Sequence, residues 1–472
     1  QGQTLGWVLA KDLSPMLRFD RIKGNKTQLL VNRDSGWQPL IDIAPSDTFY
    51  VLEVSPSAEF ALAIFARGRN TAALVRLDLT DGSEQVLHEQ ADEDLAEIIN
   101  FDLYDGKIDM VIPQVGDVTP LGFTKAGKTL AKLIAKQGQH VSIDRLLWAG
   151  NGDFVTATLS VDAQSYSYHI FDLNLGTDTK ISDFYFKTKH TDALVPTETV
   201  QITARDGMKL NALLLRPKGV DGAAPMVLEV HGGPARQVKW EYHHFRQFLV
   251  NRGYAVLAVN FRGSSGLGKI YQAAGYGEYG RKMQDDLVDA TLWAIDQGIA
   301  DPNAIAINGS SYGGYASAMG LVRDPDLFKA GIIEHAMLDV AYQSQYPPHS
   351  WGLYLGQWER YFGDINSPGD MEKMHQRSPI NLVAQMQAAA LMVAGKRDPV
   401  VGFEQTERFI STAKDLGKNI DSLIFENEGH GIDKWQSKIR HARRVEDFLA
   451  EHLGGRSGNW DWIEPIAAYL DN

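Results

Sequence analysis

Short runs in which apolar and polar positions alternate fill the first part of the chain. Residues 60–87 and 153–181 share one order: two alternating runs joined by a turn, then an Asp-rich turn and a short closing run. Alternation with a period of two is typical of strands that bury one face, and Asp-Gly and Gly-Asn steps mark the turns between them. A unit that recurs at roughly 40 residues or somewhat more indicates β-propeller blades, of which roughly three or four can be counted. An irregular β-sandwich is the alternative.

The pattern changes near residues 187–197. Beyond a hairpin-like entry at 199–217, continuous apolar runs of strand length alternate with amphipathic helical segments. The strands are expected at 225–233, 254–263, 304–311, 330–336, 389–398 and 421–430, and helices at 283–298, 404–418 and 437–455. Near-continuous apolar strands separated by helices predict a parallel sheet covered on both faces. We therefore expect an all-β, propeller-like and incomplete domain over 1–190 and an α/β domain over 191–472.

Composition limits the partners and the chemistry. The 472 residues are 44% hydrophobic and 22% charged, with a net charge of −13 and no cysteine. This length favours two domains, and the acidic balance argues against nucleic acid or an anionic membrane as the main partner. The absence of cysteine excludes disulfides, thiolate catalysis and thiolate metal sites. The chain starts at Gln1 without a signal-like segment, so we expect a soluble, processed or excised chain, cytoplasmic or periplasmic.

One glycine-flanked serine is a candidate nucleophile. Gly309-Ser310-Ser311-Tyr312-Gly313 has the form G-x-S-x-G, follows an apolar strand and leads into a helical segment. This strand–turn–helix context is that of a nucleophile elbow, in which small neighbours let the serine stand above the sheet. A helix-capping serine is the simpler alternative.

The same elbow requires a base and an orienting carboxylate, which in α/β-hydrolases follow in the order serine, acid, histidine. Asp398 follows the strand expected at 389–398, and His430 lies in a glycine-bracketed loop after the last strand. Alone, either would be read as a turn residue. In this order, at strand ends, they predict a Ser311–Asp398–His430 triad.

The tetrahedral intermediate of such a reaction needs hydrogen-bond donors. The backbone N–H of Tyr312, the residue after the nucleophile, is one candidate, and that of Gly233 in the glycine-rich loop 230–237 is the other. We expect no cofactor and no metal site.

Six segments resemble, in order, landmarks of the prolyl oligopeptidase family of serine peptidases, most closely its acylaminoacyl-peptidase and dipeptidyl-peptidase-like branch. They are HGGP (231–234), NFRGSSGLGK (260–269), GEYGRKMQDDLVDA (277–290), NGSSYGGYAS (308–317), GKRDPVV (395–401) and EGHG (428–431). The resemblance covers residues 200–455 and implies a C-terminal α/β-hydrolase domain behind an N-terminal propeller. It also implies that Ser311, Asp398 and His430 are the triad.

The chain departs from the family pattern at several points. His231 stands where some branches carry an oxyanion tyrosine, and Val400 stands where relatives often carry an arginine that binds a substrate carbonyl. The N-terminal part is too short for a seven-bladed propeller. Paired glutamates that bind a free substrate N-terminus are not identifiable.

Aromatic residues crowd the stretch 342–364, from which we single out Trp351, Tyr354 and Tyr361. With His231 they are candidates for substrate binding; a packed hydrophobic lid is the alternative. The sequence thus predicts a serine peptidase that acts on short peptides, of acylaminoacyl-peptidase or oligopeptidase type, through an acyl-enzyme. A homo-oligomer is a further expectation. A carboxylesterase with the same triad is the alternative, and a propeller binding protein with an inactive hydrolase domain is the third hypothesis.

Overall fold

The structure is a computed structural model in which the chain divides into two compact units. It describes residues 3–10, 12–23, 26–55, 57–99, 107–113, 120–138, 140–149, 152–161, 165–183, 193–351, 355–458 and 462–471. Unit 1 contains residues 1–192, 239–242 and 265–273, and unit 2 contains the remainder. The domain boundary expected after residue 190 falls outside the described residues. The two short later segments of unit 1 lie in sequence that we had assigned to the α/β domain.

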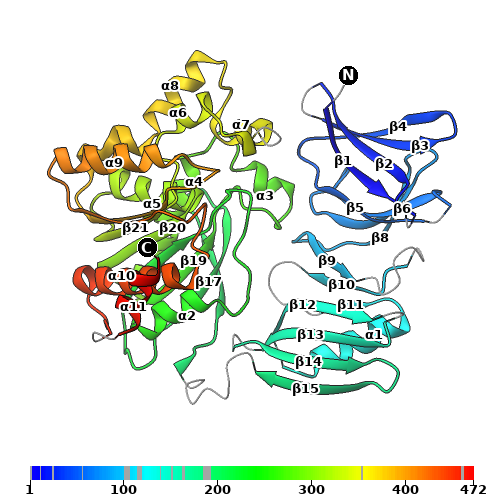
Figure 1. Cartoon of the computed structure of the whole chain (residues 1–472), viewed down its shortest axis with the longest axis horizontal. Helices are drawn as coiled ribbons and strands as arrows, with labels where there is room; N and C mark the ends of the chain where they lie inside the picture. The colour runs from blue at the N-terminus through cyan, green and yellow to red at the C-terminus, as the bar shows by residue number, and fades with distance from the viewer. Residues whose placement is uncertain are drawn as a thin grey trace. The chain divides into compact units, whose positions relative to one another are not determined.

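In its described part, unit 1 consists of four antiparallel sheets that follow one another in chain order (Figure 1). The first two contain β1 (Gln3–Leu9), β2 (Pro15–Arg21), β3 (Thr27–Arg33) and β4 (Gly36–Ile43), then β5 (Phe49–Val54), β6 (Phe60–Phe65), β7 (Ala73–Asp78) and β8 (Glu84–His88). The third contains β9 (Leu95–Ile99), β10 (Met110–Pro113) and β11 (Leu121–Gly122), followed by helix α1 (Lys125–Ala135). The fourth contains β12 (Val141–Ala149), β13 (Phe154–Val161), β14 (Ser167–Asp172) and β15 (Thr177–Asp183).

Alternation along the strands of unit 1 builds a separate core between each pair of successive sheets. On β6, Ala61, Ala63 and Phe65 pack toward the first sheet. Leu62 and Ile64, the intervening residues, pack toward the third sheet. Successive strand residues point to opposite faces, so one strand supplies two cores. Face-to-face stacking of four-stranded sheets is the arrangement of propeller blades, which confirms the propeller-like fold over the sandwich alternative.

The described residues of unit 2 form an eight-stranded sheet in the order β16-β17-β19-β18-β20-β21-β22-β23. The strands are β16 (Glu198–Thr203), β17 (Lys209–Leu215), β18 (Ala224–Val230), β19 (Ala255–Asn260), β20 (Ala300–Ser310), β21 (Ala330–Glu334), β22 (Ala389–Gly395) and β23 (Ile420–Phe425). β16 and β17 form the expected hairpin, and the strands from β19 onward in this order pair in parallel. All six predicted strands and the three predicted helices are present.

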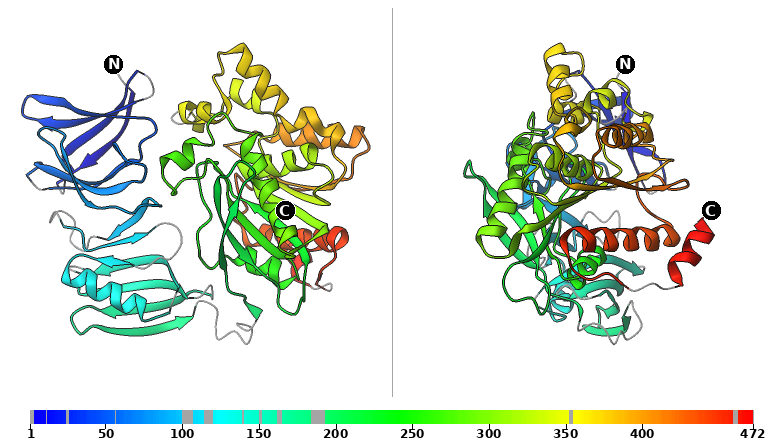
Figure 2. Two further views of the ribbon diagram at one scale, coloured as in Figure 1. Left: turned by 180° about the vertical axis from the view of Figure 1, so that it is seen from behind. Right: turned by 90° about the vertical axis from the view of Figure 1, so that its left-hand side faces the viewer.

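Helices cover both faces of this sheet: α2 and α10 on one, and α4, α5 and α9 on the other (Figure 2). The helices are α2 (His244–Asn251), α3 (Lys269–Ala273, in unit 1), α4 (Lys282–Asp296), α5 (Tyr312–Arg323), α6 (Val340–Gln345), α7 (Leu355–Phe362), α8 (Pro368–Gln376), α9 (Phe403–Asp415), α10 (Trp435–Leu453) and α11 (Ile463–Asp471). Two 3₁₀ turns, His349–Trp351 and Pro379–Gln385, accompany them.

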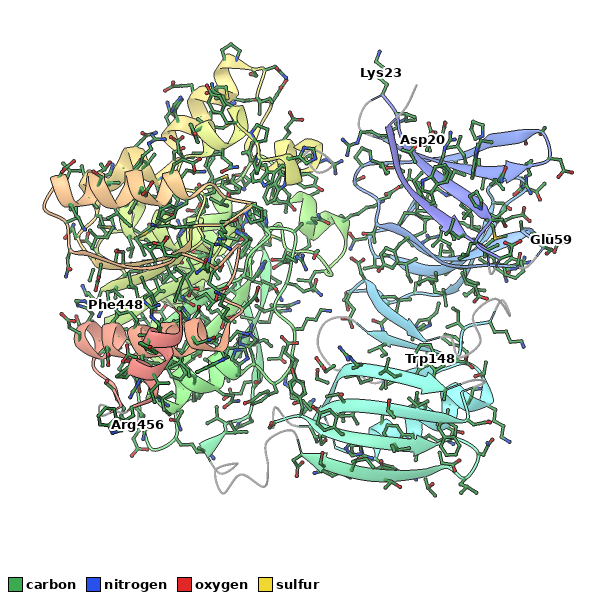
Figure 3. The ribbon with its side chains drawn as sticks, viewed as in Figure 1. Asp20, Lys23, Glu59, Trp148, Phe448 and Arg456 are labelled. Carbon is green, nitrogen blue, oxygen red and sulfur yellow. The ribbon has the colours of Figure 1, made fainter. Side chains whose placement is uncertain are left out.

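The core under α2 and α10 holds the carboxyl ends of the strands in place. Phe448, labelled on α10 in Figure 3, packs with Leu249 of α2 against apolar residues of β18 to β22. Because the parallel strands end together at one edge, the loops that follow β18, β20, β22 and β23 meet there. Among the helices of the described ranges, none has the length and apolarity needed to span a bilayer.

Candidate active site

Ser311 lies at the turn between β20 and α5, in a backbone conformation that few residues adopt. Its φ is 60° and its ψ is −117°. The turn is fixed by two backbone hydrogen bonds, from Ser311 N to Glu334 O at 2.9 Å and from Tyr315 N to Ser311 O at 3.0 Å. A non-glycine residue in such a conformation costs roughly 1–3 kcal/mol and is typical of functional turns. The geometry is that of a nucleophile elbow.

The glycines beside the serine are required by close backbone contacts. A Cβ on Gly313 would lie 2.0 Å from Val230 O, and one on Gly309 would lie 2.5 Å from Gly313 C. Such distances are far inside van der Waals contact. The elbow therefore packs directly on the end of β18, which precedes the glycine-rich loop.

Three side chains predicted to act together are hydrogen-bonded in one chain. Nε2 of His430 lies 2.9 Å from Ser311 Oγ, and Nδ1 of His430 lies 2.7 Å from Asp398 Oδ2. The other carboxylate oxygen of Asp398 accepts N–H groups of Val400 and Val401 at 2.8 and 2.9 Å. A carboxylate can only accept from Nδ1–H, so Nε2 is left as the acceptor for the serine hydroxyl. This is the tautomer that a general base needs.

The candidate oxyanion donors belong to α5 and to the glycine-rich loop after β18. Tyr312 is the first residue of α5, whose first N–H groups have no acceptor within the helix. The glycine-rich loop passes close to the elbow, since a Cβ on Gly232 would lie 3.1 Å from Ser310 O and 3.5 Å from Ser311 Cβ. Gly233 follows with a φ of 130°, which a side chain would strain. The loop that carries Gly233 therefore lies beside the elbow that carries Tyr312, and the role of their N–H groups stays a prediction.

His231 uses one ring nitrogen within this loop and the other toward the segment that follows β19. Nδ1 lies 2.7 Å from Gly232 O, Nε2 lies 2.8 Å from Ser264 Oγ, and the ring stacks on Phe261 at 4.4 Å. Burial lowers the pKa of His231 to about 4, so the ring is neutral near pH 7. A carbonyl only accepts, so Nδ1 carries the proton, while the Ser264 hydroxyl lies 2.8 Å from His231 Nε2 and 2.7 Å from Phe261 O. These contacts position the loop, and the substrate contact expected of His231 stays a prediction.

The aromatic candidates are packed rather than presented to solvent. Tyr361 is 1% exposed, and its hydroxyl donates to Gly263 O at 3.0 Å. Trp351 is 4% exposed and stacks on Trp358 with 4.7 Å between ring centroids. Neither has surface to offer a ligand, so the packed alternative describes these two residues, while Tyr354 lies outside the described residues.

Sequence reasoning missed a histidine next to the base. His335 follows β21, and its ring centroid lies 5.8 Å from that of His430. Its only sequence signal was its place at the end of an apolar strand. Within the described ranges, no cluster of three or more metal-binding side chains is placed to hold a metal ion.

Comparison with known proteins places the chain in a family. Residues 240–456 match the prolyl oligopeptidase family. The chain is 32% identical over 473 residues to dipeptidyl aminopeptidase BIII of Pseudoxanthomonas mexicana. The aligned region covers 96% of this chain and 67% of that protein. It belongs to the prolyl oligopeptidase family of serine peptidases. The chain is thus a serine peptidase by family, and the recognition made from its motifs is confirmed.

Other relatives of the family resemble the chain over different extents. Acylamino-acid-releasing enzyme 1 of Oryza sativa subsp. japonica is 25% identical over 279 residues, which is 58% of this chain and 36% of that protein. The crystal structure of puromycin hydrolase superposes with a TM-score of 0.82 at 20% identity, covering 98% of this chain and 71% of that chain. This structural likeness supports the propeller and α/β-hydrolase fold. The chain spans only part of the length of each of these proteins.

Proposed function

We propose that the chain hydrolyses peptide bonds of short peptides, with Ser311 as nucleophile, His430 as general base and Asp398 as the group that orients the base. The single observation that carries the proposal is the hydrogen-bonded chain from Asp398 Oδ2 through His430 to Ser311 Oγ, with links of 2.7 and 2.9 Å. These are the distances at which a proton can pass from the hydroxyl to the imidazole.

The reaction would follow from this geometry in two halves. Ser311 Oγ attacks the scissile carbonyl carbon as its proton moves to His430 Nε2, and the N–H groups of Tyr312 and Gly233 stabilise the oxyanion. The imidazolium then gives that proton to the leaving amine, the C–N bond breaks, and an acyl-enzyme remains. Water, deprotonated by His430, attacks the ester carbonyl carbon; the ester C–O bond then breaks, and His430 returns the proton to Ser311 Oγ as the acid is released.

The substrate class rests on the relatives. Their names describe a dipeptidyl aminopeptidase and an acylamino-acid-releasing enzyme. We infer short peptides with an acyl-aminoacyl or dipeptidyl group ahead of the cleaved bond. Two sequence-derived features stay predictions: the incompleteness of the propeller and homo-oligomer formation.

A pair of substrates separates peptidase from esterase. Acetyl-alanine p-nitroanilide should be hydrolysed, and a fluorophosphonate should label Ser311 and abolish the turnover. Ser311→Ala is the control for both measurements. Turnover of p-nitrophenyl acetate with none of the anilide or of a blocked peptide would favour the carboxylesterase, and failure of labelling would favour an inactive domain.

A further inference from the structure

A cavity of about 520 Å³ lies in unit 2 behind the nucleophile elbow. It is bounded by residues of α2 and α10 and by the carboxyl ends of β18, β20 and β21, and we call it the α2–α10 cavity. Gly232, Ser310 and Gly431 contribute to its wall, each next to a residue of the proposed catalytic machinery. Its volume is in the range of small-molecule sites. Ser311, Asp398 and His430 are not part of the lining.

His335 borders the cavity with unused hydrogen-bonding capacity. The residue is 3% exposed, and neither Nδ1 nor Nε2 has a hydrogen-bond partner. Its backbone is also held at a φ of 45°, with its N–H bonded to Val393 O at 2.9 Å. A buried imidazole without partners costs free energy, and with positive φ it is the combination found where a ligand supplies the missing bonds.

The carboxylates of the cavity are already neutralised. Glu229 accepts two hydrogen bonds from Arg246, both at 2.9 Å. Glu334 pairs with His441 at 3.2 Å and accepts from Asn308 Nδ2 at 3.1 Å. Burial alone would raise the pKa of Glu334, but His441 outweighs it and holds that pKa below its usual value. A cation would therefore find no free counter-charge in these two groups.

The exposed wall is cationic and apolar. Lys438 and His244 line the cavity and are both exposed, whereas Phe245, Phe248 and Ile432 give it apolar surface. Partial burial of the ring first, and the Lys438 ammonium next, lower the pKa of His244, so His244 adds no positive charge there near pH 7. A ligand of the α2–α10 cavity would therefore place an anionic group at Lys438 and a hydrogen-bonding group at His335.

We propose that the α2–α10 cavity binds a small organic carboxylate with an apolar side chain, such as an N-acyl amino acid or a short peptide. The carboxylate lies at Lys438, the amide or amine bonds His335, and the side chain packs on Phe245, Phe248 and Ile432. This is a site apart from the one at Ser311. It does not depend on the peptidase proposal, because binding can be measured without turnover.

The direct test is calorimetry on the whole chain carrying Ser311→Ala, with N-acetyl-L-phenylalanine as the probe and N-acetyl-L-phenylalaninamide as its neutral match. The acid should bind once per chain, and the amide should bind about tenfold more weakly, the contribution of one hydrogen bond to a charged group. Equal affinity for acid and amide, or no binding of the acid, would overturn the proposal.

Variants locate the carboxylate. The Lys438→Gln variant should bind the acid about tenfold more weakly than the parent does, and it should bind the acid and the amide equally. Replacing Lys438 and replacing the carboxylate by an amide remove the same interaction. Lys414→Gln, on α9 and outside the cavity lining, should bind the acid as the parent does. Unchanged affinity for the acid in Lys438→Gln would contradict the site.

The role of His335 is tested by two replacements that tolerate its positive φ. His335→Gly fits the positive φ and removes the ring, whereas His335→Asn also tolerates that conformation and keeps a polar group. The probe should bind the Asn variant more tightly than the Gly variant, and both variants should unfold cooperatively on heating.

A final experiment uses wild-type protein phosphonylated at Ser311. It should still bind the acid, and exclusion of the acid would place the ligand at the catalytic serine instead.

Discussion

At the scale of single residues, the proposed chemistry depends on how the two oxygens of Asp398 are used. Oδ1 accepts two backbone N–H groups, so the position that Oδ1 occupies must hold a hydrogen-bond acceptor. Oδ2 faces His430 Nδ1. Val400 therefore contributes its N–H to the carboxylate, although its side chain cannot replace the arginine of relatives.

This arrangement predicts a severe effect of Asp398→Asn. The amide oxygen will stay on the N–H groups of Val400 and Val401, so the NH₂ group will face His430 and force the proton onto Nε2. The base is then in the wrong tautomer, and kcat should fall by about 10⁴, as in the trypsin-type triad. Asp433→Asn, on an exposed position of the same region, is the control for steady-state kinetics. Near wild-type kcat in Asp398→Asn would mean that another carboxylate orients His430.

His231 predicts an acid-sensitive contribution to stability. Burial depresses its pKa to about 4 from 6.5, so the folded state binds fewer protons than the unfolded state in this window. The stabilisation is complete above pH 6.5 and is lost as the pH falls toward 4. His231→Gln should reduce the difference in unfolding free energy between pH 7.5 and 4.5 by roughly 2–3 kcal/mol. Urea titrations at both values measure it, with exposed His375→Gln as the control. An unchanged difference would mean that the ring is not held neutral.

At the scale of elements, the site depends on how closely the start of α5 approaches the end of β18. The N–H of Tyr312 belongs to α5 and that of Gly233 to the loop after β18, so their separation is set by this contact. Glycine at position 313 is what permits the approach.

Gly313→Ala tests that dependence. The new methyl group would meet Val230 O at 2.0 Å, so α5 must move from β18 and separate the two oxyanion donors. A displacement of about 1 Å at a catalytic group can cost about 10² in rate, and we expect kcat/KM to fall at least that far. Gly369→Ala is the matched control, because it lies in α8 with no atom closer than 4.0 Å to its Cβ. Its activity should be unchanged, and equal loss in both variants would disprove the packing argument.

Local patterns explain which elements could be predicted. The strands of unit 2 and the order Ser311, Asp398, His430 follow from apolar runs and from residues within a few positions of each strand end. His335 was missed because only the pairing of β21 beside β22 brings it to His430. An aromatic residue such as Tyr361 can line a pocket or pack in a core, and the sequence does not distinguish the two. The carbonyl of Gly263, which accepts the hydrogen bond of the Tyr361 hydroxyl, is remote in sequence.

At the scale of the whole molecule, the apolar cores form separate clusters. Phe171 belongs to the cluster of β10, α1, β13 and β14 in unit 1, and Phe448 belongs to the cluster of α2, α10 and the large sheet in unit 2. No cluster among the described buried residues combines the two.

Separate cores predict separate unfolding transitions. Phe171→Ala and Phe448→Ala should each destabilise their own unit by about 3–5 kcal/mol, the usual cost of removing a buried phenylalanine ring. In calorimetry each variant should lower a different transition. Loss of fluorophosphonate labelling on heating should shift only in Phe448→Ala, because Ser311 lies in unit 2. If both variants lower the same transition, the chain unfolds as one cooperative unit.

The segment 265–273 has a consequence for synthesis of the chain on the ribosome. Lys269 Nζ pairs with Asp47 at 2.8 Å and donates to Ala66 O at 3.0 Å, and Lys269 N donates to Asn70 O at 2.9 Å, all within unit 1. The sheet of β5 to β8 can therefore make these contacts only after residues about two hundred positions later have been synthesised. Until these emerge, the partly buried Asp47 carboxylate lacks its ion pair with Lys269. A gene cut after residue 192 would lack these three contacts permanently, so we expect its product to be less stable than the same residues within the whole chain.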